Sequence, residues 1–282
     1  MEPHLPRPPI VLTMAASDPT GGSGIQGDLT SIASFGCHAL SVITALTVQD
    51  SAGIENTMAV DCDWLEDQAR SILEDMPVRC FKIGALGSIE NIAVAAEIVA
   101  DYPDIPLVLH PALASGHDDQ LIDEDMFGAM HELLLPQTTL VAMNSLEARR
   151  FCACLDEDEP SSIPPFDECA RRLLEAGCEY ALLTGMQQSM TTMANELHDR
   201  NGRVLLDEWN RLPGSFHGAG CTLSASIAAC MACGLDMEEA VRQAQKYTWQ
   251  TLATAFRPGM GKLLPNRFFW TRAAAQNEGN SN

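Results

Sequence analysis

Short apolar runs that end in glycine-rich turns and lead into helical patterns recur along the first half of the chain. In the first of them, residues 10–16 are apolar and partly β-branched, a dense turn occupies residues 17–24, and a helical pattern follows from about residue 25 to residue 35. Three such strand–helix units favour a parallel sheet, because parallel strands need a long crossover connection and helices supply it. The sequence therefore predicts an α/β fold with a single doubly wound, mostly parallel sheet flanked by helices.

The remaining elements follow from the same patterns. Further strands are expected at residues 39–46, 80–84, 107–111, 140–142 and 180–185, and helices at residues 63–75, 88–100 (with Ser88 as the N-cap), 123–135, 166–176 and 236–254. Asn201-Gly202 lies between residues 191–198 and 203–209 and predicts a hairpin. Loops are expected at residues 114–119 and 156–165. No break in composition divides the chain, so we expect one domain over residues 1–282, with flexible ends at residues 1–8 and 270–282.

A run of small residues, Gly218-Ala219-Gly220, is followed at once by an apolar helical pattern over residues 223–232. Glycine lets the backbone turn sharply and lets another molecule approach its N–H groups. The helix points its free N–H groups and its positive dipole end back at the loop, which makes an anion site. Cys221 lies in the first turn, where the helix N-terminus should lower its pKa. The alternative is an ordinary glycine-rich loop with Cys221 as a small buried apolar residue.

The formal net charge of −21 argues against nucleic acid or an anionic membrane as a partner. It does not exclude a nucleotide, because a local cradle of N–H groups and a metal ion can outweigh the overall field. No window has the length of a membrane span, and residues 1–9 lack the apolar core of a secretory signal, so a cytoplasmic location is expected. A surface this acidic also suits a salt-rich cytoplasm, which we treat as a hypothesis.

Two motifs resemble the hydroxymethylpyrimidine/phosphomethylpyrimidine kinases of the ribokinase superfamily. Residues 17–28 resemble the N-terminal signature of that family, and residues 217–221 resemble its anion-hole motif, with Cys in place of the acid found in sugar kinases. Lys82-Ile83-Gly84 matches as well. The resemblance covers residues 9–262. It implies a ribokinase-like fold and an ATP- and Mg²⁺-dependent kinase that phosphorylates 4-amino-5-hydroxymethyl-2-methylpyrimidine and then its monophosphate in thiamine biosynthesis.

The same resemblance implies roles for individual residues. It places the pyrimidine against Ala16, Asp28, Val48, Gln49 and Ala85, the ATP phosphates against Asn144, Thr184, Gly185 and Gly220, and a metal-organising carboxylate at Glu147. It also implies that the N–H groups of Gly218, Ala219, Gly220 and Cys221 bind the transferring phosphoryl group. The Cys221 thiolate would act as the base. The carboxamide of Gln49 can match an amino group and a neighbouring ring nitrogen, since it offers one acceptor and two donors. Without the resemblance, Gln49 would be interpreted as a polar residue at a strand end.

Several of these residues fall near the ends of expected strands or at helix starts, where a doubly wound sheet binds its ligands. They are Asp18, Gln49, Lys82, His110, Asn144, Thr184 and Cys221. We therefore expect one active-site cleft that contains all seven.

The chain departs from the family pattern at a few positions near this site. His110 stands where the family has an Asp before Pro, and the others are Ala16 for Gly, Ala85 for Met, Met143 for Pro and Met186 for Gly. The loss of a carboxylate matters most, because hard divalent cations prefer oxygen ligands. Two alternatives stay open: a pyridoxal kinase of the same superfamily, and a non-catalytic pyrimidine-binding regulator on the kinase fold. A homodimer is also expected, because members of the superfamily are often dimers.

Overall fold

The computed structural model describes residues 7–112, 124–154 and 164–271. The loop expected at residues 114–119 and nearly all of the one expected at 156–165 lie outside these residues. The same holds for most of the two expected flexible ends, at residues 1–6 and 272–282.

All described strands belong to one sheet in the order β3-β2-β1-β4-β5-β6-β7-β8-β9. The parallel strands are β1 (Ile10–Ser17), β2 (His38–Gln49), β4 (Cys80–Ile83), β5 (Leu107–Leu109), β6 (Leu140–Asn144) and β7 (Tyr180–Gln187). Antiparallel strands lie at both edges: β3 (Ile54–Ala59) beside β2, and the hairpin of β8 (Thr192–Asp199) and β9 (Gly202–Asn210) beside β7. The mostly parallel, doubly wound sheet and the hairpin predicted from the sequence are confirmed. The direction of winding reverses between β1 and β4, which is the point where such sheets bind ligands.

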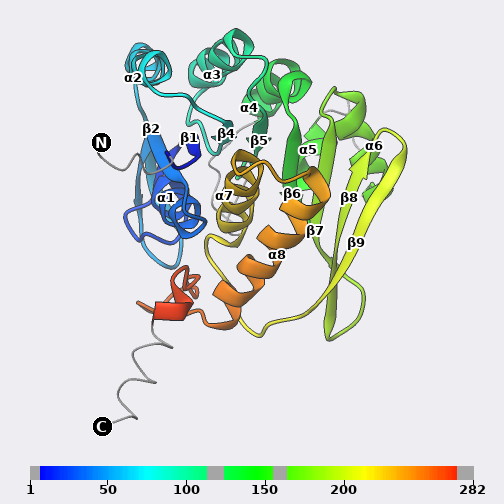
Figure 1. The fold of residues 1–282 in the computed structure, drawn as a ribbon. Helices are drawn as coiled ribbons and strands as arrows, with labels where there is room; N and C mark the ends of the chain where they lie inside the picture. Colours follow the sequence, from blue (N-terminus) through cyan, green and yellow to red (C-terminus); the bar gives the residue numbers. More distant parts are fainter. Residues whose placement is uncertain (1–6, 113–123, 155–163, 272–282) are drawn as a thin grey trace, which may run out of the picture.

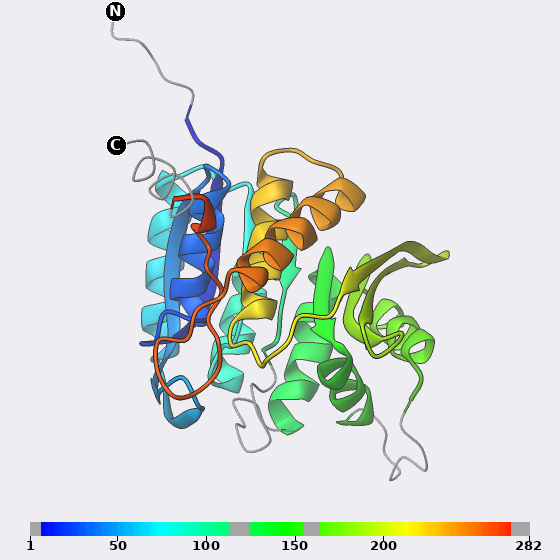
Figure 2. The same ribbon diagram turned by 90° about the horizontal axis from the view of Figure 1, so that it is seen from below.

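Helices cover both faces of the sheet (Figures 1 and 2). One face carries α1 (Gly24–Ser34), α7 (Ala219–Ala232) and α8 (Met237–Ala253), and the other carries α2 (Cys62–Asp75), α3 (Ile89–Asp101), α4 (Glu124–Ala129), α5 (Ser145–Cys154) and α6 (Phe166–Glu175). Side chains of β1 alternate between the two cores, because successive residues of a strand point to opposite faces. Leu12 and Met14 pack under α2 to α6, and Val11 packs under α1, α7 and α8.

Helix α7 lies at the centre of its face and is buried on nearly every side, which accounts for its run of small and apolar residues. It contacts β4, β5, β1 and β6, so its first turn lies beside the reversal point of the sheet. Local capping also follows the sequence: Ser88 accepts the N–H of Asn91 at 3.1 Å and begins α3 as predicted.

Two elements differ from the expectation. The single helix expected at residues 123–135 is shorter as an α-helix: α4 ends at Ala129 and continues as a π-turn, Met130–Leu134, and a 3₁₀ turn, Leu135–Gln137. Pro136 has no N–H for a regular helical bond, which fits the tightened end. Strand β3 was not predicted. Among the described residues, no helix has the length and apolar character that crossing a bilayer requires.

Candidate active site

A cavity of about 560 Å³ opens at the carboxyl ends of the parallel strands, beside the first turn of α7. Its lining includes all seven residues that the sequence analysis placed at strand ends and helix starts. The other predicted site residues that line it are Ala16, Ala85, Glu147, Gly185, Gly218, Ala219 and Gly220. One cavity therefore brings together most of the residues assigned to the pyrimidine and all of those assigned to the phosphates and the metal.

Asp28 and Val48 are not part of the cavity lining. Asp28 is fully buried, where it accepts hydrogen bonds from Thr13 Oγ1 and from the Lys82 Nζ, each at 2.7 Å. Lys82 does line the cavity, so Asp28 acts on the cavity through that lysine. Val48 lies between two lining residues of β2 and points to the opposite face of the strand, where its side chain is 59 % exposed.

The turn into α7 has the geometry that an anion cradle needs. Gly218 is the N-cap and adopts a φ of 89°, in the left-handed region that favours glycine. A side chain at this position would overlap the carbonyl oxygen of Gly22. The following N–H groups, from Ala219, Gly220 and Cys221, have no carbonyl of their own helix to bond, because they occupy its first turn. They are therefore available to an anion in the cavity.

Cys221 is buried beside two cationic side chains. His110 donates its Nδ1 hydrogen to the carbonyl oxygen of Ala142 at 3.0 Å, which directs Nε2 toward the start of α7. An added Cβ on Gly220 would lie 2.6 Å from that Nε2. Burial raises the pKa of Cys221, but its interaction with His110 and the charge of Lys82 together lower it. This agrees with the predicted direction and adds two causes that the sequence analysis did not assign.

The pKa of His110 shifts in the opposite direction from that of Cys221. Burial lowers the pKa of its imidazole, but the Cys221 sulfur and the carboxylate of Glu147 outweigh burial and raise the pKa to about 9. The two shifts together favour a proton on His110 and a negative charge on the sulfur of Cys221.

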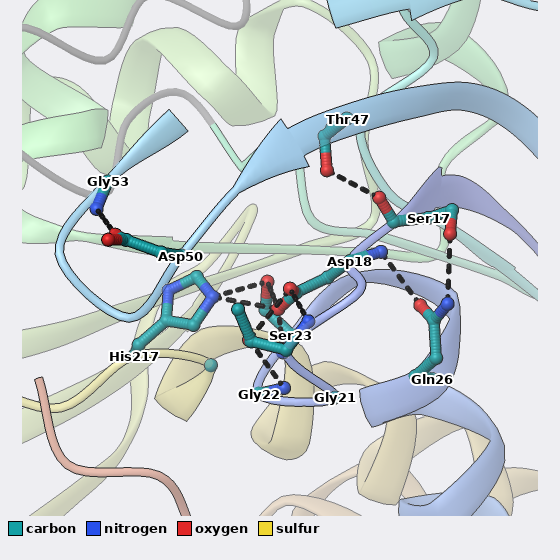
Figure 3. Close-up of polar contacts among 12 residues, drawn as sticks. Ser17, Asp18, Gly21, Gly22, Ser23, Gln26, Thr47, Asp50, Gly53 and His217 are labelled. Atoms are coloured by element: carbon teal, nitrogen blue, oxygen red, sulfur yellow. Dashed lines mark hydrogen bonds and ion pairs between the residues drawn. The ribbon is translucent and has the colours of Figure 1, made fainter. Parts of the chain in front are cut away.

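Asp18 also lines the cavity and is the centre of a hydrogen-bond cluster (Figure 3). One carboxylate oxygen accepts the N–H and hydroxyl of Thr20 at 2.8 and 2.7 Å, and the other accepts the N–H and hydroxyl of Ser23 at 2.7 and 3.0 Å and the His217 Nε2 at 2.8 Å. Burial would raise the pKa of Asp18, but hydrogen bonds from His217, Thr20 and Gln49 hold it well below its usual range. Asp18 was expected in the cleft but without a role of its own, and His217 was not singled out, although both lie inside the two motifs that carry the resemblance.

Arg267, which the sequence analysis also missed, ties three segments together beneath the site. Its guanidinium donates to the carbonyl oxygens of Gly21 and Gly22 at 3.2 and 2.6 Å and to the hydroxyl of Thr222 at 2.9 Å. The segment after α8 thus fixes the glycine-rich turn after β1 against the first turn of α7.

The remaining predicted residues line the cavity where β6, α5 and β7 meet it. Asn144 Oδ1 accepts the N–H of Glu147 at 2.9 Å, and the carboxylate of Glu147 accepts the N–H of Asn144 at 2.8 Å, which is a reciprocal helix cap at the start of α5. Gly185, with a φ of 75°, donates its N–H to Asn195 Oδ1 at 2.9 Å. Thr184 Oγ1 lies 3.5 Å from the Met143 carbonyl oxygen.

An aromatic end of the cavity was not foreseen. Trp209 and Trp249 stack with ring centroids 6.4 Å apart, and both line the cavity. Gln245 accepts the N–H of Trp209 at 3.0 Å and of Asn195 at 2.7 Å, which fixes this wall. The four residues come from β8, β9 and α8, so only the folded chain brings them together.

The donor set of the cavity fits a hard cation that is carried by a phosphate ligand. Mg²⁺ is commonly held by one or two carboxylates together with substrate phosphates and water, and Glu147 supplies one buried carboxylate here. A second group of possible ligands, Asp167, Glu196 and His198, lies away from the cavity lining. There, Glu196 is already paired with His198 and Arg203, each at 2.9 Å.

Comparisons with known proteins agree with this geometry. Residues 18–266 match the family model described as phosphomethylpyrimidine kinase. The chain is 32 % identical over 258 residues to a hydroxymethylpyrimidine/phosphomethylpyrimidine kinase of Streptomyces coelicolor, covering 90 % of this chain and 92 % of that protein. The crystal structure of a phosphomethylpyrimidine kinase from Clostridium difficile 630 superimposes with a TM-score of 0.70 at 26 % identity, covering 85 % of this chain and 97 % of that one. A pyridoxal kinase from Staphylococcus aureus in complex with AMP-PCP shares the fold, with a TM-score of 0.83 at 23 % identity and coverage of 95 % and 96 %.

Proposed function

The chain belongs to the phosphomethylpyrimidine kinase family, and on that basis we propose that it transfers the γ-phosphoryl group of ATP to 4-amino-5-hydroxymethyl-2-methylpyrimidine and then to its monophosphate, in thiamine biosynthesis. One observation carries the proposal: a single cavity holds the side-chain amide of Gln49 and, in the first turn of α7, free N–H groups beside the sulfur of Cys221, whose pKa is lowered. The pyrimidine would lie against Gln49, Ala16 and Ala85, with its hydroxymethyl group toward Cys221.

In the first transfer, the Cys221 thiolate would accept the hydroxyl proton as the hydroxymethyl oxygen forms its bond to the γ-phosphorus and the bond to ADP breaks. The N–H groups of Ala219, Gly220 and Cys221 would stabilise the charge on the transferring phosphoryl group, which is the main task of an enzyme in this reaction. His110 would carry a hydrogen on both Nδ1 and Nε2, and its positive charge would keep the sulfur of Cys221 ionised. In the second transfer the attacking phosphate oxygen carries no proton, so the sulfur would orient it.

The phosphates of ATP would lie against Asn144, Thr184, Gly185 and Gly220. Mg²⁺, which neutralises phosphate charge when bound, would be held by Glu147 through water. The proposal also includes a cytoplasmic location and, given the acidic surface, no nucleic-acid or membrane partner. A homodimer is supported by the exposed apolar side chains of Leu46, Val48 and Met58 on β2 and β3, and light scattering tests it.

The proposal is tested by ADP release with ATP and each of three acceptors: the hydroxymethylpyrimidine, its monophosphate and pyridoxal. Cys221→Ala should lower kcat with the hydroxymethylpyrimidine by about 100-fold or more, the usual worth of a positioned base. Cys62→Ala, on α2 and outside the cavity lining, serves as the matched control and should match the wild type.

The two alternatives have distinct outcomes in the same assay. Faster turnover of pyridoxal than of either pyrimidine would replace the substrate assignment. Absence of ADP release in both the wild type and Cys221→Ala, with pyrimidine still bound in calorimetry, would favour a non-catalytic regulator.

A further inference from the structure

Two cysteines meet at the end of α7 opposite the anion cradle. Cys233 is the C-cap of that helix, and Cys37 immediately precedes β2. Their sulfur atoms lie 3.5 Å apart, although 196 positions separate the two residues in the sequence. We propose that this pair is an oxidation site, which a hydroperoxide converts into a disulfide that joins the start of β2 to the end of α7.

Both cysteines are held at one carbonyl group. The carbonyl oxygen of Ala229 accepts the N–H of Cys233 at 3.0 Å and the S–H of Cys37 at 3.6 Å. On the other side of Cys37, the N–H of His38 bonds to the carbonyl oxygen of Pro9 at 2.8 Å, which fixes this segment beside β1. With its hydrogen directed to Ala229, the sulfur of Cys37 has lone pairs left to face Cys233.

The contact needs only a small movement to become a covalent bond. A disulfide requires sulfur atoms about 2.0 Å apart, so the two sulfurs must approach each other by about 1.5 Å. Cys233 can supply this movement, because it is exposed and lies at the end of a helix, where the chain opens most easily. Cys230, one turn earlier in α7, is buried inside the helix packing and lacks this freedom.

The two sulfurs differ in what they can react with. Cys233 is exposed, whereas Cys37 is buried with 7 % of the residue exposed. Burial and the neighbouring Cys233 thiol raise the pKa of Cys37 to about 12, so Cys37 stays protonated and does not react with a peroxide by itself. A hydroperoxide in solution therefore reaches Cys233 first.

The reaction then follows in two balanced steps. The sulfur of Cys233 attacks an oxygen of the hydroperoxide, so that an S–O bond forms and the O–O bond breaks. The products are a sulfenic acid and one molecule of water, or of alcohol from an organic peroxide. The sulfur of Cys37 next attacks the sulfur of Cys233, so that the S–S bond forms, the S–O bond breaks, and the thiol hydrogen leaves with the hydroxyl group as water. Contact between the two groups favours this second step despite the raised pKa of Cys37.

The crosslink joins two elements whose other ends line the cavity. Strand β2 ends at Gln49, and α7 begins with the cradle. At about 1.5 Å per residue, the 14 residues of α7 separate Cys233 from the cradle by about 20 Å. The disulfide closes a long loop, and long loops give the largest stabilisation in the chain-entropy account. Oxidation at this pair therefore stabilises the fold at a distance from the reacting groups.

The test treats the reduced full-length protein with a few equivalents of hydrogen peroxide, alkylates the remaining thiols, and maps unreduced peptides by mass spectrometry. We expect a Cys37–Cys233 disulfide within single molecules. The urea midpoint of the oxidised protein should rise by about 0.5 M or more, and dithiothreitol should restore the original value.

Three variants separate the steps. In Cys37→Ser the sulfenic acid of Cys233 has no thiol to react with, so dimedone should label it. In Cys233→Ser neither the crosslink nor the shift of the urea midpoint should appear, and Cys37 should stay unmodified. Cys62→Ser is the matched control, because Cys62 is the other cysteine that is not buried among those whose side chains the structure describes. This control should form the same disulfide as the wild type.

A wild type in which peroxide modifies Cys233 without forming the crosslink would overturn the inference. So would a disulfide from Cys37 to Cys230, crosslinks only between molecules, or an equal rise of the urea midpoint in Cys233→Ser. None of these measurements uses ATP or a pyrimidine, so the outcome is independent of the proposed function.

Discussion

At the scale of single residues, His110 acts on the ionisation of Cys221, whereas its position in the sequence suggests only the loss of a metal-binding carboxylate. It stands where the resembling family has a carboxylate, and the sequence analysis therefore treated it as a weakened metal site. Burial lowers the pKa of the imidazole, but the sulfur of Cys221 and the carboxylate of Glu147 outweigh this effect and raise it. A carboxylate there would add negative charge next to the sulfur, whereas the imidazolium stabilises the thiolate.

The pairing predicts how Cys221 reacts with iodoacetamide. Because His110 lowers the pKa of Cys221, alkylation should continue below the pH at which an ordinary thiol, with a pKa of about 8.5, loses its thiolate. In His110→Gln the pKa should rise, so alkylation at pH 7 should slow severalfold and recover toward the wild-type rate as the pH increases. Peptide mass spectrometry follows Cys221, with Cys62 as the internal reference. Superimposable pH profiles for the two proteins would contradict the pairing.

At the scale of elements, the two ends of α7 provide a natural comparison. Gly218 before its first residue and Gly234 after its last turn have nearly the same φ, 89° and 88°. A methyl group at Gly218 would overlap the backbone of Gly22, whereas at Gly234 it would meet no atom within 4 Å. A side chain at either glycine would therefore carry the same conformational penalty. Only a side chain at Gly218 would also collide with the glycine-rich turn after β1.

Gly234→Ala should lower the free energy of unfolding by about 1 kcal/mol, the cost of a left-handed backbone. Gly218→Ala should lower it by about 3 kcal/mol, because the turn after β1 must move away. Gly218→Ala should also reduce kcat at least tenfold, because misplaced N–H groups stabilise the phosphoryl group poorly. Urea unfolding and steady-state kinetics measure both effects. Equal losses of stability and activity in the two variants would contradict the close packing of the turns.

The same elements show what could be predicted from the sequence. Strands such as β1 and β5 are buried on both faces, so their largely apolar runs are visible in the sequence. Strand β3 is a half-exposed edge strand of mixed composition and carried no such signal. The anion loop was found because its glycines and the helix are contiguous. The bond from His217 to Asp18 and those from Arg267 to Gly21 and Gly22 join residues about 200 or more positions apart, and only the folded chain reveals them.

At the scale of the whole molecule, the acidic surface should make stability depend on salt. The chain has 38 acidic and 17 basic side chains. For 282 residues the radius of gyration is about 19 Å. The Debye length is about 30 Å at 0.01 M salt, which exceeds the radius of gyration. At 0.15 M salt it is about 8 Å, which is shorter than the radius of gyration. Repulsion across the folded molecule is therefore felt at low salt and screened at physiological salt, whereas the exposed ion pairs that salt also weakens contribute little.

We expect the free energy of unfolding to rise by about 1 kcal/mol or more between 0.01 and 0.15 M NaCl, measured as a shift of the urea midpoint. Glu74→Lys/Glu97→Lys is the matched variant, because both glutamates are exposed on helices of one face, α2 and α3. It reduces the net charge by four, so it should be more stable than the wild type at 0.01 M NaCl and respond less to added salt. Sucrose at equal osmolality controls for solute exclusion, which stabilises proteins without screening charge. A midpoint that stays constant with NaCl, or that shifts equally in the variant, would show that the acidic excess does not limit the stability of this fold.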